Sequence, residues 1–198
     1  MPAMNAKTND TRQHILQVGY DLIVTKGFTS VGLSELLKTA NVPKGSFYHY
    51  FKSKEHFGES LIQDYFTNYL SDIAPLFESP AKTGYQSLIE YFERWMDLDN
   101  GCCNANKCLI VKLSAEVSDL SESMRLALRS GADKIIAAIA QCIEKGIADG
   151  SIDVKDSEKA AHQIYYVWVG ASLLNKLYQD QSGLKQCLEN TKLLLKGQ

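Results

Sequence analysis

Apolar positions recur at helical spacing along most of the chain. In residues 11–26, Ile15, Val18, Leu22 and Ile23 fall on one side of a helix, with polar residues on the other. The same period returns later, at Met124, Leu128, Ile135, Ile136, Ile139 and Ile147 and again at Ile164, Val167, Trp168, Ala171 and Leu174. Neither an alternating strand pattern nor an internal repeat interrupts it, so the sequence predicts an all-α fold.

Short breaks near the N-terminus divide the first residues into three helices. Gly27 is a plausible stop for the first helix. The second is expected over 33–40 and ends at Asn41, because asparagine tolerates the left-handed backbone of a tight corner and Pro43 cannot continue a helix. A third helix is expected over 44–51, and Lys54 opens a fourth.

Later breaks are expected at 79–80, 100–101, 150 and 181–183. The pattern therefore predicts two domains, with a small three-helix domain over residues 1–56 and a larger helical bundle over residues 57–198.

Composition narrows the class of protein. A chain of 198 residues with 45% hydrophobic residues can bury a substantial core. The longest uncharged apolar run, IYYVWVGASLL, is too short to cross a hydrocarbon layer of about 30 Å, so no membrane partner is expected. Five cysteines without a secretory signal indicate free thiols and a cytoplasmic location. No histidine accompanies them at ligand spacing, so neither a metal nor another cofactor is predicted.

The segment VPKGSFYHYFKSKE, at Val42–Glu55, combines basic and aromatic residues behind a tight corner. Phe47 and Phe51 lie four apart and can anchor one face of the third helix in the core. Two short helices joined by such a corner form the geometry with which a recognition helix enters the DNA major groove. Residues 1–60 carry seven Lys/Arg against five Asp/Glu, while the remainder carries 14 against 18, so the first domain is the more basic part. A solvated surface helix is the alternative interpretation.

The stretch GFTSVGLSELLKTANVPKGSFYHYFKSKE resembles the helix-turn-helix of TetR-family transcriptional regulators, with its glycine-aromatic pair, lysine-glycine, aromatic-rich helix and serine-lysine-glutamate. The resemblance implies an N-terminal DNA-binding domain and a divergent helical regulatory domain. It further implies that the groove is faced by Lys44, Gly45, Ser46, Tyr48 and His49, and that phosphates are touched by Tyr50 and Lys54.

Cys108, in NANKCLIVKLSAEV, is the candidate for chemistry in the second domain. If Asn104 or Asn106 caps a helix here, Cys108 lies in its first turn, where the macrodipole favours a thiolate. The positive charges of Lys107 and Lys112 would also favour the thiolate and so lower the thiol pKa. A thiolate is the species that attacks electrophiles and is oxidised. The alternative is that Cys108 is a small buried apolar residue.

The stretch CLIVKLSAEVSDLSESMR resembles a subgroup of the TetR family that responds to reactive electrophiles and oxidants through cysteine chemistry. This resemblance implies that Cys108 is the sensor and makes Lys176 a candidate for its charged neighbour. Cys102 and Cys103 could supply a resolving thiol.

Two other functions stay open. A repressor of this type could instead respond to an unmodified hydrophobic inducer held between aromatic side chains. A thiol-dependent enzyme is a further alternative, although no histidine lies near Cys108 in sequence as a base. We expect a non-enzymatic homodimer formed through residues 157–179 and 184–195, which would bind a palindromic operator.

Overall fold

The computed structural model describes residues 3–99 and 102–197. Over these residues the fold is all-α, as predicted, with one short antiparallel pair of strands that the sequence pattern did not reveal. The elements in chain order are α1 (Ala3–Lys26), α2 (Leu33–Ala40), α3 (Lys44–Tyr50), α4 (Lys54–Phe77), α5 (Gly84–Met96), β1 (Leu98–Asp99), β2 (Cys102–Cys103), the 3-10 helix η1 (Asn104–Lys107), α6 (Leu109–Val117), α7 (Glu122–Ala148), α8 (Ser157–Tyr178) and α9 (Ser182–Leu195).

The chain forms two compact units, each of which combines two stretches of sequence. The first unit comprises residues 1–67 and 112–131, and the second comprises residues 68–111 and 132–198. The functional boundary expected after residue 56 stays a prediction. No described helix is long and apolar enough to cross a membrane.

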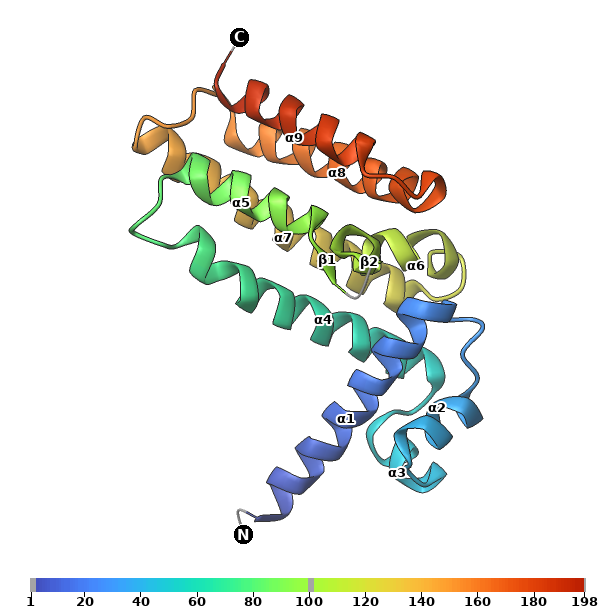
Figure 1. Ribbon diagram of the computed structural model, residues 1–198. Helices are drawn as coiled ribbons and strands as arrows, with labels where there is room; N and C mark the ends of the chain where they lie inside the picture. The colour runs from blue at the N-terminus through green and yellow to red at the C-terminus, as the bar shows by residue number, and fades with distance from the viewer. Residues whose placement is uncertain (1–2, 100–101, 198) are drawn as a thin grey trace. The chain divides into compact units, whose positions relative to one another are not determined.

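The first unit contains the predicted three-helix arrangement of α1, α2 and α3 (Figure 1). α1 begins earlier than expected, at Ala3, and Gly27 ends it with a φ of 87°. Asn41 has the predicted left-handed conformation, with φ 51° and ψ 45°, and its N–H reaches back to carbonyls of α2. These two residues fix the corners before and after α2.

Three phenylalanines hold α3 in place. Phe47, Phe51 and Phe57 are all at most 1% exposed, and their ring centroids lie 5.2 to 5.7 Å apart. Such close aromatic contacts stabilise a small core beyond the burial of area alone. The predicted anchoring role of Phe47 and Phe51 is therefore confirmed, and the opposite face of α3 is left for solvent.

The second unit is built around α5, α8 and α9. Phe92 of α5 stacks on Trp168 of α8, with centroids 4.6 Å apart and an interplanar angle of 20°. The Trp168 Nε1–H donates to Thr191 Oγ1 of α9 at 3.0 Å. α8 and α9 consequently run side by side, as Figure 1 shows in orange and red.

Most of the predicted breaks in the second unit are confirmed. α4 ends before Ser79-Pro80, and Thr83 starts α5 through a reciprocal capping box with Gln86. Gly150, two residues after the end of α7, has a φ of 77°. The last break is shifted, because Gln179 adopts a φ of 56° and α9 already begins at Ser182. The break predicted at 100–101 falls outside the described residues.

Candidate DNA-binding surface and cysteine site

The corner between α2 and α3 presents a short helix with a polar, aromatic outer face. Pro43 precedes α3 with extended backbone, and its carbonyl accepts from Ser46 N at 3.0 Å, so the helix starts sharply at Lys44. Because Phe47 points into the core, its neighbours Tyr48 and His49 are exposed.

The residues predicted to face DNA are accessible to different degrees. Lys44, Gly45, Tyr48 and His49 are exposed, and the Lys44 Nζ lies 5.8 Å from the centroid of the Tyr48 ring. Gly45 has open space around the position that a Cβ would take. Ser46 and Tyr50 are half-buried. Their contacts with DNA stay predictions, and the structure brings the exposed four together on one short helix.

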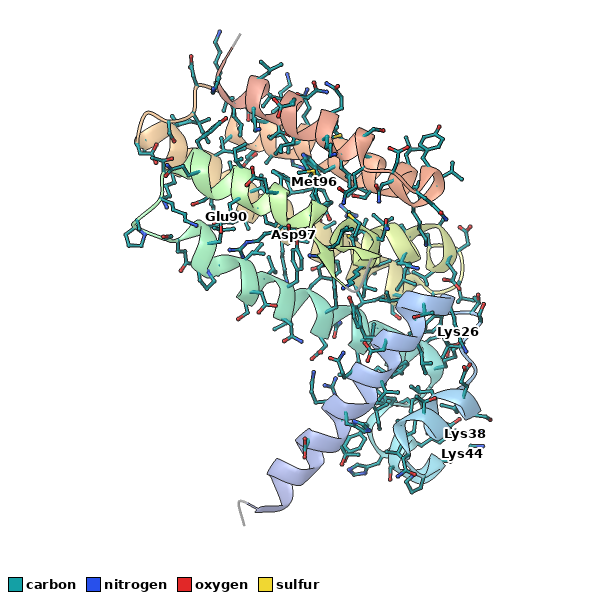
Figure 2. All side chains as sticks on the ribbon, viewed as in Figure 1. Lys26, Lys38, Lys44, Glu90, Met96 and Asp97 are labelled. Atoms are coloured by element: carbon teal, nitrogen blue, oxygen red, sulfur yellow. The ribbon has the colours of Figure 1, made fainter. Side chains whose placement is uncertain are left out.

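Lys38 is a cation of this region that no sequence motif marks. It is exposed in the last turn of α2, six residues before Lys44 at the start of α3, and both lysines are labelled in Figure 2. Lysine side chains at such a corner can contact phosphates without reading sequence. The only signal in the sequence was one lysine just before the turn, which any amphipathic helix could carry.

Lys54, predicted to touch a phosphate, has an additional structural role. Its Nζ donates to the Phe28 carbonyl at 2.8 Å and lies 4.5 Å from the centroid of the Phe28 ring. Burial lowers the pKa of Lys54, against the opposing charges of Glu55 and Glu116. The phosphate contact stays a prediction, and in the protein without DNA the ammonium group holds the loop after α1.

Glu116 of α6 is a functional candidate that sequence reasoning missed. One carboxylate oxygen accepts from Phe28 N at 3.0 Å, and the other accepts from Thr29 N at 2.6 Å and from the Thr29 hydroxyl. Burial raises the pKa of Glu116, but these hydrogen bonds and the charge of Lys54 outweigh it, so the net shift is downward. The carboxylate thus fixes the loop that leads into α2.

Cys108 is the residue between η1 and α6. Its N–H donates to the Ala105 carbonyl at 3.4 Å, and Leu109 begins α6 directly after it. The expectation that Asn104 or Asn106 caps this helix is wrong, because both lie in η1. Asn104 instead donates to carbonyls of Arg94 and of Asp97, two residues at the end of α5 (Figure 2 labels Asp97).

A cluster of aromatic hydroxyl groups adjoins Cys108. Tyr69 OH accepts from Trp95 Nε1 at 3.2 Å and lies 2.8 Å from Tyr91 OH. Burial raises the pKa of both Tyr69 and Tyr165, and negative charge on Cys108 raises each further. The charge of Cys108 therefore acts on both phenols. Cys108 itself is buried, with 9% of its surface exposed.

The other described cysteines are buried thiols. Cys103 Sγ donates to the Trp95 carbonyl at 3.1 Å, and Cys142 Sγ donates to the Gly84 carbonyl at 3.5 Å. Burial raises the pKa of Cys142 to about 12 and also raises that of Cys187. Neither these three cysteines nor Cys108 forms a disulfide bond among the described residues. The side chain of Cys102 lies outside the described part of the chain, so its predicted resolving role stays a prediction.

Lys176 lies in the last turn of α8 with an exposed side chain. Its neighbour Asn175 is the residue that turns towards η1, where its Nδ2 donates to Asn106 Oδ1 at 3.2 Å. The role of Lys176 beside Cys108 stays a prediction. Among the described residues, no group of three or more His, Cys, Asp or Glu side chains could hold a metal ion.

One face of α8 and the adjoining part of α9 expose large apolar side chains. A groove of about 500 Å³ between the two helices is lined partly by Val167, Cys187 and Leu194. The exposed apolar residues are Tyr166, Val167, Leu173, Leu174, Leu177 and Tyr178 of α8 and Leu193 of α9. An apolar surface of this kind is typical of a protein interface, and it coincides with the elements predicted to form a dimer.

The N-terminal and C-terminal parts of the chain both match known protein families. Residues 15–61 match the family model of bacterial regulatory proteins, tetR family, and residues 84–190 match the Tetracyclin repressor-like C-terminal domain. The HTH-type transcriptional repressor NemR of Escherichia coli K12 is 38% identical over 194 residues, covering 97% of this chain and 98% of that protein. The repressor DhaR of Mycobacterium sp. GP1 is 30% identical over 89% of this chain and 88% of its own length.

A solved structure of the same repressor, NemR, is also similar to this chain. The crystal structure of E. coli NemR in its reduced form has a TM-score of 0.86 and 39% identity, covering 92% of this chain and 95% of that one. These relatives are regulators of transcription and not enzymes, and regulators of this type bind operator DNA and dimerise. The chain belongs to the TetR family of bacterial transcriptional regulators.

Proposed function

We propose that this chain is a cytoplasmic, homodimeric repressor that occupies a palindromic operator and releases it when a small electrophile or oxidant modifies Cys108. The similarity to a repressor whose structure is described as a reduced form supports a signal based on thiol chemistry. The exposed face of α3 supports an interface with the major groove.

The observation that carries the proposal is the position of Cys108 directly before α6. The same helix bears Glu116, whose carboxylate holds the Phe28–Thr29 loop that leads into α2. Because the helix is continuous from Leu109 to Val117, a displacement at its first turn is transmitted along it. Cys108 and the helix-turn-helix are therefore linked through one secondary-structure element.

A covalent adduct on Cys108 supplies the required displacement. With an N-ethylmaleimide probe, the thiolate sulfur forms a bond to an alkene carbon, and the π electron pair moves to the adjacent carbonyl as an enolate, which takes a proton from water. The added ring cannot be accommodated around a side chain that is 91% buried unless the surrounding helices move. Conversion from mostly bound to mostly free requires about 5.5 kcal/mol of differential stability, which a covalent adduct in a packed core can supply.

The test is fluorescence-anisotropy binding to DNA from upstream of the protein's own gene, with and without stoichiometric N-ethylmaleimide. The wild type should bind and be released, whereas Cys108→Ser should bind and stay bound. Cys142→Ser is the matched control, because Cys142 is also buried and burial raises its thiol pKa to about 12. This variant should respond as the wild type does.

Release of Cys108→Ser by the electrophile would show that the signal enters elsewhere. Release of that variant by an unmodified hydrophobic compound would instead support the reversible inducer, the second function open to this fold. Three aromatic side chains that could line such a pocket, Phe92, Trp95 and Trp168, pack against one another in the core.

A further inference from the structure

A hydrogen bond between two asparagines joins η1 to the last turn of α8. Asn175 Nδ2 donates to Asn106 Oδ1 at 3.2 Å, although the two residues are 69 positions apart in the sequence. Asn175 is only 6% exposed, and its Oδ1 is buried without a hydrogen-bond partner among the described residues. The buried amide group of Asn175 is therefore held by its hydrogen bond to Asn106.

The chain just before Asn106 is attached to the end of α5. Asn104 Nδ2 donates to the Arg94 carbonyl at 3.1 Å, and Asn104 N donates to the Asp97 carbonyl at 2.9 Å. Cys103 Sγ donates to the Trp95 carbonyl at 3.1 Å. These bonds satisfy carbonyls that the end of a helix leaves without an intrahelical partner. This stretch of chain thus connects α5 with α8.

Cys108 ends η1 two residues after Asn106, and its N–H donates to the Ala105 carbonyl at 3.4 Å. In the N-ethylmaleimide adduct, the sulfur is bonded to a former alkene carbon, and the neighbouring carbon has gained a proton from water. An added ring at this buried position displaces the chain that carries it. Among the described residues, three hydrogen bonds hold the chain before Cys108 to α5 and one holds it to α8, so the contact with α8 is the weaker one.

We infer that modification of Cys108 breaks the hydrogen bond between Asn106 and Asn175 and thereby opens the last turn of α8. Once Asn106 moves away, both ends of the buried Asn175 amide lack a partner, which is unfavourable until the amide reaches water. The amide reaches water when the last turn of α8 opens. That turn is closed by a hydrogen bond from Gln179 N to the Asn175 carbonyl at 2.8 Å.

The last turn of α8 belongs to the apolar face that is predicted to meet a second subunit. Leu174 and Leu177, on either side of Asn175 in the sequence, are both exposed on this face. Opening of the turn displaces these leucines and so changes the surface that the second subunit would contact. The inference rests on the proposed function of Cys108 and adds a route from the modified cysteine to the subunit interface.

The test is hydrogen–deuterium exchange of the full-length protein, followed by mass spectrometry in peptides that cover residues 172–179. Exchange is measured before and after treatment with stoichiometric N-ethylmaleimide, and peptide mass spectrometry verifies that the adduct is on Cys108. In the wild type, modification should speed exchange in this turn about tenfold, because loss of the Asn175 hydrogen bond favours the open turn.

Substitutions at the two ends of the hydrogen bond should have opposite effects. Asn106→Ala leaves the Asn175 amide without a partner, so the turn should exchange about tenfold faster even without the electrophile. Asn175→Leu keeps the size of the side chain and removes the amide, so exchange should stay slow both before and after modification. A contact that only stabilises the fold would instead give faster exchange in both variants.

Asn104→Ala is the matched control, because it removes a side-chain amide of the same 3-10 helix that binds α5 and not α8. This variant should exchange as the unmodified wild type does and should still respond to modification. Unchanged exchange in the modified wild type, or an equal response in Asn175→Leu, would overturn the inference. Failure of the proposed function would be seen separately, as release of Cys108→Ser from DNA by the electrophile.

Discussion

Glu116 and Thr29 are separated by 87 residues in the sequence, yet the carboxylate of the first accepts both the backbone N–H and the hydroxyl of the second. Phe28 N donates to the other carboxylate oxygen. A single side chain of α6 thereby replaces the partners that this loop would otherwise take from water. The loop also carries the Phe28 carbonyl that binds Lys54, so the acid and the base hold the same turn from two helices.

Replacement of Glu116 by glutamine should destabilise the protein and weaken operator binding. The amide retains one acceptor oxygen but places an NH₂ group against a backbone N–H, so at least one hydrogen bond is lost. We expect a loss of about 1 kcal/mol, because the carboxylate is only half-buried, and a several-fold weaker operator affinity. Urea unfolding and anisotropy measure the two effects.

The matched control is Glu122→Gln. Glu122 also binds its partner Arg125 through both oxygens, but this pair is on the surface of α7. Exposed pairs contribute little to stability, so this variant should unfold and bind DNA like the wild type. If Glu116→Gln and Glu122→Gln have the same stability and the same operator affinity, Glu116 does not couple α6 to the loop.

The Glu116 contribution should depend on pH. Its pKa is lower in the folded protein than in the unfolded chain, so the unfolded chain binds more protons in acid. The stabilisation is therefore fully present above the unfolded pKa, at about pH 4, and is lost as the pH falls through the lower folded value. The difference in urea midpoint between wild type and Glu116→Gln should stay constant from neutral pH down to that point and then shrink. A difference that grows in acid would contradict the sign of the shift.

Substitution of Gly45 by alanine separates stability from recognition. A Cβ at this position meets nothing within 4 Å, and alanine is favoured over glycine in a helix by about 0.5–1 kcal/mol. The variant should thus unfold at a higher urea concentration. If the bare backbone at the start of α3 approaches a phosphate, the added methyl group should nevertheless lower operator affinity at least about tenfold.

Gly183→Ala provides the comparison for Gly45. Gly183 lies in α9 and also has open space around its Cβ position. It should gain similar stability without any change in operator affinity. Unchanged affinity in Gly45→Ala would show that this part of α3 does not approach DNA closely.

The local features of the fold could be predicted from sequence because their causes are local. Asn41 adopts a left-handed corner and Phe47 anchors α3 for reasons contained within a few residues. Glu116 could not be found in this way, since its partner Thr29 is distant in the chain and neither residue has an unusual neighbour. The 3-10 helix at 104–107 was also missed, because two asparagines near an apolar run resemble an ordinary helix cap.

Only part of the cysteine site could be predicted, because only part of it depends on neighbouring residues in the sequence. The start of a helix is a local property, but the predicted place of Cys108 in the first turn is wrong, because α6 begins one residue later, at Leu109. The phenols of Tyr69 and Tyr165 come from α4 and α8, and aromatic residues at helical spacing look the same whether they fill a core or face a thiol. The sequence therefore did not reveal that the charge of Cys108 acts on both phenols.

Removal of the Lys44 charge should reduce the salt dependence of operator binding. Lys44 is exposed at the start of α3, and a lysine on a phosphate releases counterions when it binds. In Lys44→Ala, the slope of log affinity against log salt concentration should become shallower by about 0.9 for each recognition helix, or about 1.8 for a dimer. Lys185→Ala, an exposed lysine of α9, should leave the slope unchanged. A slope that is unaltered in Lys44→Ala would place this lysine outside the phosphate contacts.

A charge on the exposed apolar face of α8 should separate the subunits. Leu177 is 71% exposed in the isolated chain, which is unfavourable for leucine unless a partner covers it. In a two-fold interface, Leu177→Asp would bury two carboxylates. An uncompensated buried charge costs about 3 kcal/mol or more, so the dimer dissociation constant should rise at least a hundredfold.

Size-exclusion chromatography with light scattering reads out the change in mass for Leu177→Asp, and operator affinity should fall with it because a monomer reaches only one half-site. Leu126→Asp makes the same substitution at an exposed leucine of α7 and should remain dimeric. If Leu177→Asp stays a dimer, the subunits meet elsewhere, and the apolar face of α8 then needs another partner. If both variants dissociate, the effect is a general one of added charge and does not locate the interface.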